Sequence, residues 1–152
     1  MNIELTKSQE DYLEAIYIID QREKNVRIKH ISEYLEVKNP SVLKAINILK
    51  NKDLVEHHKY GYVFLTEKGK KVAKIIYKKH EIITDFFKKI LNVPPDIAEE
   101  DACQLEHTIH KITYDRMSKF LEYIENCPKK DEEGPLPKFK YFLKHGRRPD
   151  NQ

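Results

Sequence analysis

The segment KNPSVLKAINILKNKDLVEHHKYGYVFLT (residues 38–66) decides the fold that the sequence predicts. Pro40 fits the first turn of a helix, and Asn39 fits the cap before it. The apolar residues that follow have the spacing of one inward helix face: Val42, Ala45, Ile46 and Leu49. The second part of the segment holds two β-rich runs around Lys-Tyr-Gly, which predicts a hairpin with a tight glycine turn.

The preceding residues complete the motif. RIKHISEYLEV (residues 27–37) predicts a short helix that buries Ile31, Tyr34 and Leu35. Two helices joined by a short turn form a helix-turn-helix, and the hairpin makes it the winged form that reads DNA. The alternative is a helical hairpin that only packs. A first helix is expected from about Ser8 to Gln21, opened by one of two capping boxes, Thr6 with Gln9 or Ser8 with Asp11.

The rest of the chain predicts further helices. One runs from Thr66 or Glu67 to about Leu91 and is apolar enough for a subunit interface. The next are expected at about 96–110 and 113–126. Residues 128–152 form an aromatic and basic tail. Three roles remain open for this tail: docking on the body of the protein, docking on a partner subunit, and contact with DNA. The predicted fold is therefore mainly α, with a winged helix-turn-helix domain at 1–66, a helical domain at 67–127 and the tail at 128–152.

Composition argues against a disulfide-rich, a secreted or a membrane protein. The net charge of +3 comes entirely from residues 128–152, which hold seven basic and four acidic residues, so net charge alone does not indicate nucleic-acid binding. Cys103 and Cys127 form no CxxC pair. The chain has no apolar run of about 18 residues and no hydrophobic signal peptide at its start. We therefore expect a cytoplasmic protein without membrane contact, in which thiols stay reduced.

Three potential metal ligands stand close together in ACQLEHTIH (residues 102–110). Cys103, Glu106 and His107 have i, i+3 and i+4 spacing, so in a helix they share one face. A thiol, a carboxylate and an imidazole are ligand types for one transition metal. The alternative is a buried cysteine beside two solvated polar residues. By itself, a pair such as Asp11 and Glu14 is more often a solvated surface feature than a ligand pair. A lone histidine among apolar residues, such as His80, is more often a partly buried core residue than a ligand.

The order of these residues is the informative signal. QEDYLEAIYII, the segment 37–73, KHEIITDFF and CQLEH together resemble the family of the diphtheria toxin repressor and the manganese transport regulator (DtxR/MntR). The resemblance runs from about Leu5 to Cys127. It implies a metal-activated transcriptional repressor and no enzyme. The helical domain would bind Fe²⁺ or Mn²⁺ and dimerise, and the homodimer would bind a palindromic operator in double-stranded DNA. The SH3-like third domain of longer members is expected to be absent.

The resemblance also implies a ligand set. The positions that match the family's metal ligands are Asp11, Glu14, His80, Cys103, Glu106 and His107. Asp11 matches manganese-type members and Cys103 matches iron-type members, and we favour Fe²⁺ slightly because of the thiolate. Thr84 and Glu99 replace a glutamate and a histidine of the iron type's second site. A second metal there would need His80 and Glu99 with Glu81 or Asp85.

The expected DNA contacts lie on the second helix and the wing. The helix from Pro40 would enter the major groove with Ser41, Leu43, Lys44 and Asn47 outward. Lys59, Tyr60 and Lys68 would lie near phosphates. Two other functions remain open at this point: a winged-helix regulator that needs no metal, and a small metalloenzyme, for which the sequence shows no nucleophile pattern and no glycine-rich loop.

Overall fold

A computed structural model of the chain describes residues 4–23, 25–126 and 135–149. The structure is mainly α with one small sheet, as the sequence predicts. It divides into two compact units between Lys78 and Lys79, inside the long helix α4 (Glu67–Asp85). In the described part of the chain, no helix combines the length and the apolar character that a membrane span requires.

Three helices build most of the first unit, and α1 (Lys7–Arg22) has a capping box. The Thr6 hydroxyl accepts a hydrogen bond from the Gln9 backbone, and the Gln9 side chain accepts one from the Thr6 backbone, both at 3.4 Å. This confirms the first of the two predicted boxes. The helix-turn-helix consists of α2 (Ile28–Tyr34) and α3 (Asn39–Asn51).

The cap of α3 lies one residue before the predicted position. Lys38 is the cap, because its carbonyl accepts the first helical bond from the Ser41 amide at 2.9 Å. Asn39 is therefore already helical, and its prediction as the cap was wrong. Pro40 lies in the first turn, as predicted, where its missing amide hydrogen costs no helical bond.

The wing is an antiparallel sheet with strand order β1-β3-β2. Its strands are β1 (Val26–Arg27), β2 (Val55–His57) and β3 (Tyr62–Leu65), and Val55 faces Leu65 across the hairpin. The 3₁₀ turn η1 (Lys59–Gly61) closes the hairpin with two left-handed residues, Tyr60 (φ 67°) and Gly61 (φ 77°). Glycine adopts this conformation without steric cost. The hairpin confirms the predicted wing, whereas β1 was not predicted because two residues show no periodicity.

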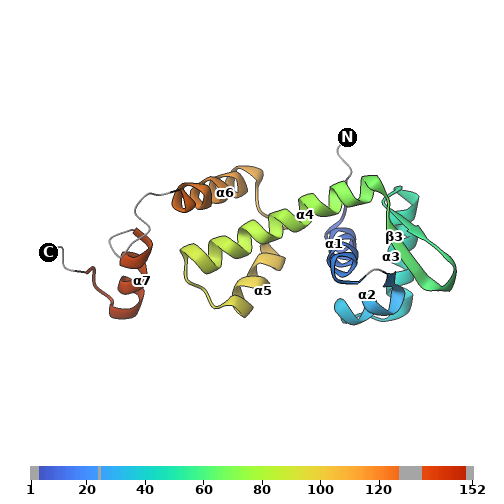
Figure 1. The fold of residues 1–152 in the computed structure, drawn as a ribbon, viewed down its shortest axis with the longest axis horizontal. Coiled ribbons are helices and arrows are strands. Elements are labelled where there is room, and N and C mark those ends of the chain that lie inside the picture. Colours follow the sequence, from blue (N-terminus) through green and yellow to red (C-terminus); the bar gives the residue numbers. More distant parts are fainter. Residues whose placement is uncertain (1–3, 24, 127–134, 150–152) are drawn as a thin grey trace. The chain divides into compact units, whose positions relative to one another are not determined.

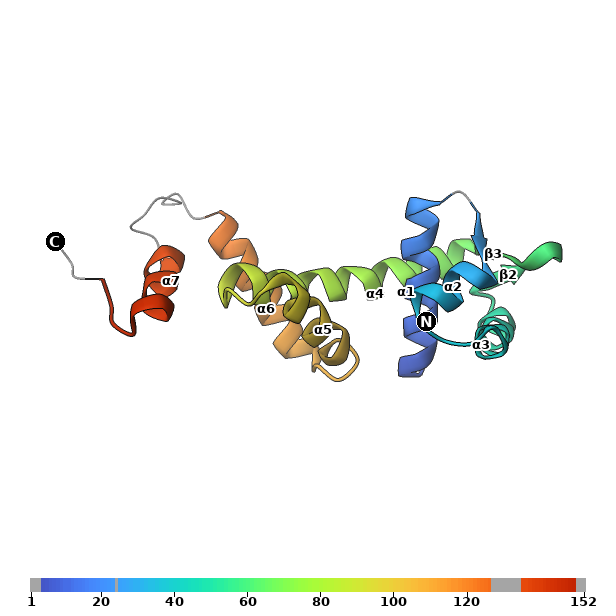
Figure 2. The same ribbon diagram turned by 90° about the horizontal axis from the view of Figure 1, so that it is seen from below.

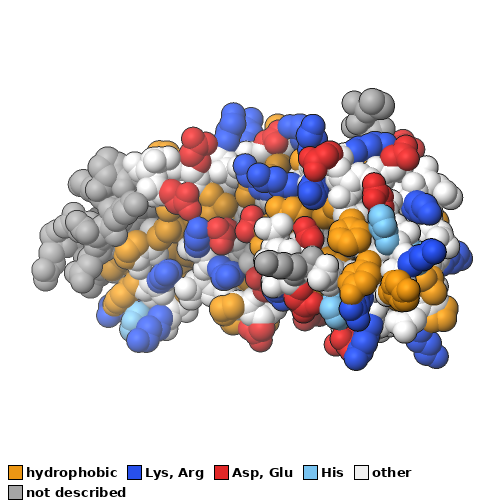
Figure 3. All heavy atoms as spheres, turned by 45° about the vertical axis from the view of Figure 1, so that its right-hand side comes forward, with side chains coloured by type: hydrophobic (Ala, Val, Ile, Leu, Met, Phe, Trp, Pro, Cys, Tyr) orange, Lys and Arg blue, Asp and Glu red, His pale blue; other side chains and the backbone are white. Residues whose placement is uncertain are grey.

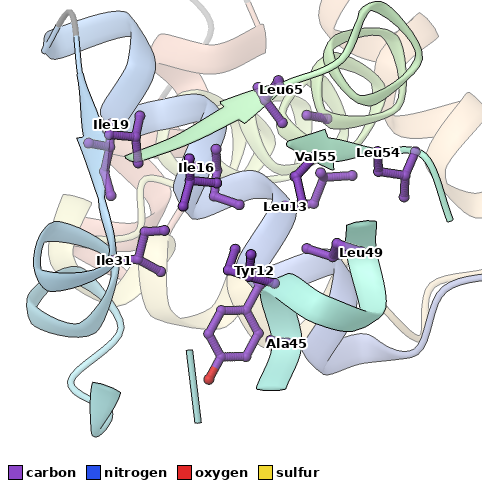
Figure 4. Packing of buried hydrophobic residues seen from close by; sticks show 14 of the residues in the cluster. Tyr12, Leu13, Ile16, Ile19, Ile31, Ala45, Leu49, Leu54, Val55 and Leu65 are labelled. Atoms are coloured by element: carbon purple, nitrogen blue, oxygen red, sulfur yellow. The ribbon is translucent and has the colours of Figure 1, made fainter. Parts of the chain in front are cut away.

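One apolar core holds the first unit together. Its sixteen buried residues come from α1, α2, α3, the strands and the start of α4, and Figure 4 shows Leu13, Ile16, Leu49 and Val55 converging. The predicted inward face of α3 is confirmed, because Val42, Ala45, Ile46 and Leu49 are all buried. Tyr34 is 44% exposed, so its predicted burial was wrong. Ile31 and Leu35, at i and i+4, define the inward face of α2, so Tyr34, at i+3, lies at the edge of that face.

The second unit begins inside α4. The predicted single helix to Leu91 is α-helical only to Asp85 and then widens into a π-helical turn, η2 (Phe86–Ile90). Helix α5 (Pro95–Leu105) ends five residues earlier than predicted, because the chain turns at 106–108. Helix α6 (Lys111–Glu125) follows, and both helices pack against the end of the long helix (Figure 1). The predicted tail contains a further helix, α7 (Pro135–His145), while Cys127 lies outside the described residues.

The core of the second unit is small. Ile83, Ala102 and Met117 form its buried cluster, with partly buried aromatic and aliphatic residues packed around it. A charged link supports the packing, since the Lys89 ammonium lies 2.7 Å from the Asp85 carboxylate and 3.0 Å from that of Glu125. Hydrogen bonds to these two carboxylates raise the pKa of Lys89. Polar contacts thus supplement a limited apolar core.

Candidate metal centre and DNA-binding surface

Helix α1 carries two carboxylates on one face. Asp11 and Glu14 are one turn apart, and their neighbours Leu13 and Ile16 are fully buried in the core. Glu14 is only 8% exposed and Asp11 is half-buried. Burying a carboxylate costs free energy unless a partner compensates for the lost water, so this placement indicates more than a solvated surface pair. Burial, together with the Asp11 charge, also raises the pKa of Tyr12.

The second unit brings together three of the predicted ligands. His80 lies on α4, and its Nδ1 is 2.9 Å from Oε2 of Glu106 at the end of α5. The other oxygen of Glu106, Oε1, is 3.2 Å from Nε2 of His107. Glu106 is 1% exposed, and thus one buried carboxylate lies between two imidazoles.

The end of α5 explains how Glu106 and His107 reach this position. Glu106 is the C-cap of the helix, and its amide donates to the Ala102 carbonyl at 2.9 Å. His107 follows in the turn, where its side chain is 4% exposed. The i, i+1 pair therefore turns inward at a helix end rather than on a continuous helical face, which is a geometry that the sequence did not predict.

Glu99 is a member of this cluster that the predicted ligand set left out. Its Oε2 lies 2.8 Å from Nε2 of His80, so both ring nitrogens of His80 face carboxylates. The spacing contained a signal for it, because Glu99 and Glu106 are seven residues apart. Two helical turns return a side chain to nearly the same face.

Cys103 is placed differently from the other predicted ligands of this unit. It lies on α5 between Glu99 and Glu106 in sequence, but its side chain is exposed. The alternative of a buried cysteine is therefore wrong.

The buried donor set fits a divalent transition metal. Imidazole suits iron and related metals, and carboxylates suit Mn²⁺. His80, Glu106 and His107 offer two nitrogens and a carboxylate within a few ångströms, shielded from water. The first unit adds two more carboxylates on one helix face. These residues match the predicted chemistry, and their role as ligands stays a prediction.

The exposed face of α3 has the character of a DNA-reading surface. Ser41, Leu43, Lys44 and Asn47 are all exposed, as predicted, while the opposite face is buried. Residues 38–52 contain four lysines and no acidic residue. On the face drawn in the space-filling view, charges of both signs are interspersed (Figure 3). The basic character therefore comes from local arrangement, not from net charge.

The wing and the start of α4 carry a second set of exposed residues predicted to contact DNA. Its tip, between β2 and β3, projects away from the helices of the unit (Figure 2). Lys59 is exposed there, and Tyr60 is 91% exposed. Lys68 is also exposed, but its ammonium donates to the Lys52 carbonyl at 2.8 Å. This bond ties the start of α4 to the end of α3.

Comparison with known sequences decides the family. The family described as "Iron dependent repressor, N-terminal DNA binding domain" matches residues 4–63. The one described as "Iron dependent repressor, metal binding and dimerisation domain" matches residues 66–134. The HTH-type transcriptional regulator MntR of Shouchella clausii is 34% identical over 120 residues, which are 79% of this chain and 83% of the relative. The chain belongs to the DtxR/MntR family.

Further relatives of this DtxR/MntR chain agree. MntR of Bacillus subtilis is 32% identical over 83% of this chain and 89% of its own length. The solved structure of the manganese regulator SloR has a TM-score of 0.67 at 29% identity, covering 95% of this chain and 81% of SloR. T. acidophilum IdeR has a TM-score of 0.69 at 25% identity, covering 80% of this chain and 56% of IdeR.

Membership of the DtxR/MntR family settles the class of function. The chain is a metal-dependent transcriptional repressor that binds DNA and carries a domain for metal binding and dimerisation. The family consists of DNA-binding regulators, so the metalloenzyme alternative and the metal-independent regulator are both excluded. The predicted winged helix-turn-helix and the family resemblance are confirmed.

Proposed function

We propose that this repressor responds to Mn²⁺ and that its metal ligands are Asp11, Glu14, His80, Glu106 and His107. The observation that carries the proposal is the buried Glu106 carboxylate between two imidazoles. Three of the five side chains offer carboxylate oxygens, which are the hard donors that suit Mn²⁺, and the other two offer imidazole nitrogens. SloR, a solved neighbour, is named as a manganese regulator, and ScaR as a manganese-activated repressor.

Fe²⁺ is the second candidate, and one residue favours it. A Cys103 thiolate would be a softer donor that raises affinity for Fe²⁺ more than for Mn²⁺. The preference for Fe²⁺ in the sequence rested on this thiolate. Because the Cys103 side chain is exposed, we place Mn²⁺ first and treat Cys103 as a sixth, optional ligand.

The two groups of ligands lie on different units, and this supports a mechanism for activation. Asp11 and Glu14 belong to the DNA-binding unit, and the other three belong to the helical unit. A bound divalent cation supplies positive charge that offsets these carboxylates. Residues from both units that share one ion would favour a single arrangement of the units, and such differential affinity is what a ligand-driven switch requires.

DNA reading would follow the exposed surfaces. We place α3 in the major groove, with Pro40 at its leading turn, where Ser41, Leu43, Lys44 and Asn47 reach base edges. Asn47 offers the amide that pairs with adenine. Lys59 and Tyr60 at the wing would contact phosphates. Lys68 would add a nearby charge while its ammonium holds the end of α3.

Assembly and location complete the proposal. A two-fold dimer fits a palindromic operator, because two recognition helices then meet two half-sites. We keep the predicted boundaries of a DNA-binding domain at 1–66, a metal-binding and dimerisation domain at 67–127, and a tail at 128–152. A regulator that binds bacterial operators acts in the cytoplasm, which is where we place this protein.

One titration tests the proposed function. Operator binding is measured anaerobically with Mn²⁺, Fe²⁺ and Zn²⁺ in parallel, on the wild type, Cys103→Ala and His107→Ala. We expect activation by Mn²⁺ that survives Cys103→Ala and disappears in His107→Ala. Activation that only Fe²⁺ supports, and that Cys103→Ala removes, would reverse the metal assignment and make Cys103 a required ligand.

A further inference from the structure

The two ring nitrogens of His80 face carboxylates in different surroundings. Nδ1 is 2.9 Å from Glu106, whose side chain is 2% exposed, and Nε2 is 2.8 Å from Glu99, whose side chain is 55% exposed. The His80 side chain itself is 16% exposed. The imidazole thus spans from the buried part of the cluster to the surface of α5.

In a metal-binding histidine, one ring nitrogen binds the metal and the other carries the hydrogen. A histidine that binds a metal through one nitrogen usually donates its other N–H to a carboxylate, which fixes the tautomer and the ring orientation. Nδ1 is on the side of Glu106 and His107, where the donors gather. Nε2 is on the side of Glu99, where a hydrogen on this nitrogen would meet a carboxylate acceptor.

We propose that Glu99 is a positioning residue for metal binding, which holds the Nε2–H of His80 so that Nδ1 is the metal donor. The inference rests on the proposed function, since it requires His80 to be a ligand. Glu99 would not touch the metal. Its carboxylate would orient the ring and increase the basicity of Nδ1, as outer carboxylates do in other metal sites.

The surroundings of Glu99 argue against the alternative role of ligand to a second metal. Such an ion would need further oxygen donors near His80. Asp85 is engaged by Lys89 at 2.7 Å, and position 84 offers a threonine hydroxyl in place of a carboxylate. Within the described residues, no group of three close potential ligands includes Glu99 or the exposed Glu81. A single hydrogen bond to His80 is the use of Glu99 that the contacts support.

The test compares four variants of the full chain: Glu99→Ala, Glu99→Gln, Glu100→Ala and His80→Ala. Glu100 is the exposed neighbour of Glu99 on α5 and serves as the matched control. Mn²⁺ affinity is measured from the electron paramagnetic resonance signal of the free ion. We expect Glu99→Ala to weaken binding by about 10-fold or more. Glu99→Gln, whose amide oxygen still accepts from Nε2–H, should recover part of this loss, and Glu100→Ala should match the wild type.

A spectroscopic readout reports the position of the hydrogen directly. With Zn²⁺ as a diamagnetic probe, long-range ¹H–¹⁵N correlation of the wild type should show His80 with its hydrogen on Nε2. Circular dichroism checks that each variant is folded, and the Glu99→Gln substitution is mild enough to remain informative if Glu99→Ala is not.

The outcomes separate this inference from the proposed function. If His80→Ala binds Mn²⁺ as tightly as the wild type, the proposed ligand set is wrong. If His80→Ala is impaired but both Glu99 variants are not, only the positioning role is wrong. A hydrogen on Nδ1, or the loss of one of two bound ions in Glu99→Ala, would likewise overturn the positioning role.

Discussion

The two units of this repressor are built on different cores. In the part of the chain that the structure describes, sixteen buried residues form one apolar cluster in the DNA-binding unit, whereas three form the cluster of the helical unit. Next to that small cluster, the helical unit buries Glu106 among histidines. Apolar burial contributes roughly 25 cal/mol per Å², so the first unit has much the larger intrinsic stabilisation.

This difference indicates where the metal matters for stability. The DNA-binding unit has enough apolar contact to fold around its own core. The helical unit places polar groups at buried positions, and burying a polar group costs free energy unless a hydrogen bond or a counter-charge compensates for the lost water. We therefore expect metal to stabilise the helical unit, and the first unit to respond to changes in apolar packing.

The largest expected effect is a steric one in the DNA-binding unit. A Cβ added at Gly69 would lie 1.9 Å from the Leu54 carbonyl oxygen. Because this oxygen belongs to the backbone, the clash can be relieved only if the backbone shifts. Gly69→Ala gains about 1 kcal/mol of helix propensity, but overpacking costs about 3 kcal/mol or more. Urea unfolding should show a net loss of stability. Lys71→Ala, an exposed change on the same helix, is the control and should shift stability by less than about 0.5 kcal/mol.

A somewhat smaller effect should come from metal on the helical unit. At a free Mn²⁺ concentration 10 times the dissociation constant, stability should rise by about 1.4 kcal/mol. His107→Ala should remove most of this gain. Amide hydrogen exchange locates the effect, and protection should increase more in α5 than in α3. An equal increase in both helices would remove the contrast between the units.

Substitutions on the DNA surface should leave both cores intact. Asn47→Ala is expected to weaken operator binding by about 1–3 kcal/mol and to relax the preference at one base pair. Lys59→Ala should weaken binding to all sequences alike and reduce the salt dependence. Binding isotherms on the operator and on a scrambled duplex distinguish them. Equal, sequence-independent losses in both variants would mean that α3 does not read bases.

The smallest effect concerns the start of α1, which carries Asp11 and Glu14. Thr6→Ala removes the hydroxyl of the capping box and should cost about 1 kcal/mol in unfolding free energy. Thr6→Ser keeps the hydroxyl and should cost much less. A loss of the same size in both variants would show that the methyl group, and not the cap, matters at this position.

Much of the fold was predictable from local patterns. The inward face of α3, the capping box and the hairpin turn depend on residues within a few positions of each other, which the sequence displays. The two-residue strand β1 was missed because it exists only through pairing with β3. The π-helical turn after Asp85 and the early end of α5 were missed as well, since packing sets helix ends as much as propensity does.

The candidate site was predictable in composition but not in geometry. Family resemblance identified His80, Glu106 and His107, and the structure brings these three together. Helical spacing placed Cys103 on the same face, yet α5 ends before Glu106, so the thiol and the buried pair do not share one regular helix. Helical spacing places Glu99 on the same side of α5 as Glu106, but its contact with His80 joins two helices, and spacing within one helix does not predict a contact with another.

The most direct test of the account measures operator affinity with and without saturating Mn²⁺, in the wild type and in Glu14→Gln. Glu14 belongs to the DNA-binding unit, so the variant keeps the donors of the helical unit. We predict that Mn²⁺ tightens wild-type binding about 5- to 150-fold. The variant should still bind Mn²⁺ but lose most of this coupling. Equal operator affinity in metal-free and metal-loaded wild type, with Mn²⁺ binding confirmed in parallel, would contradict the claim that the metal acts by joining the two units.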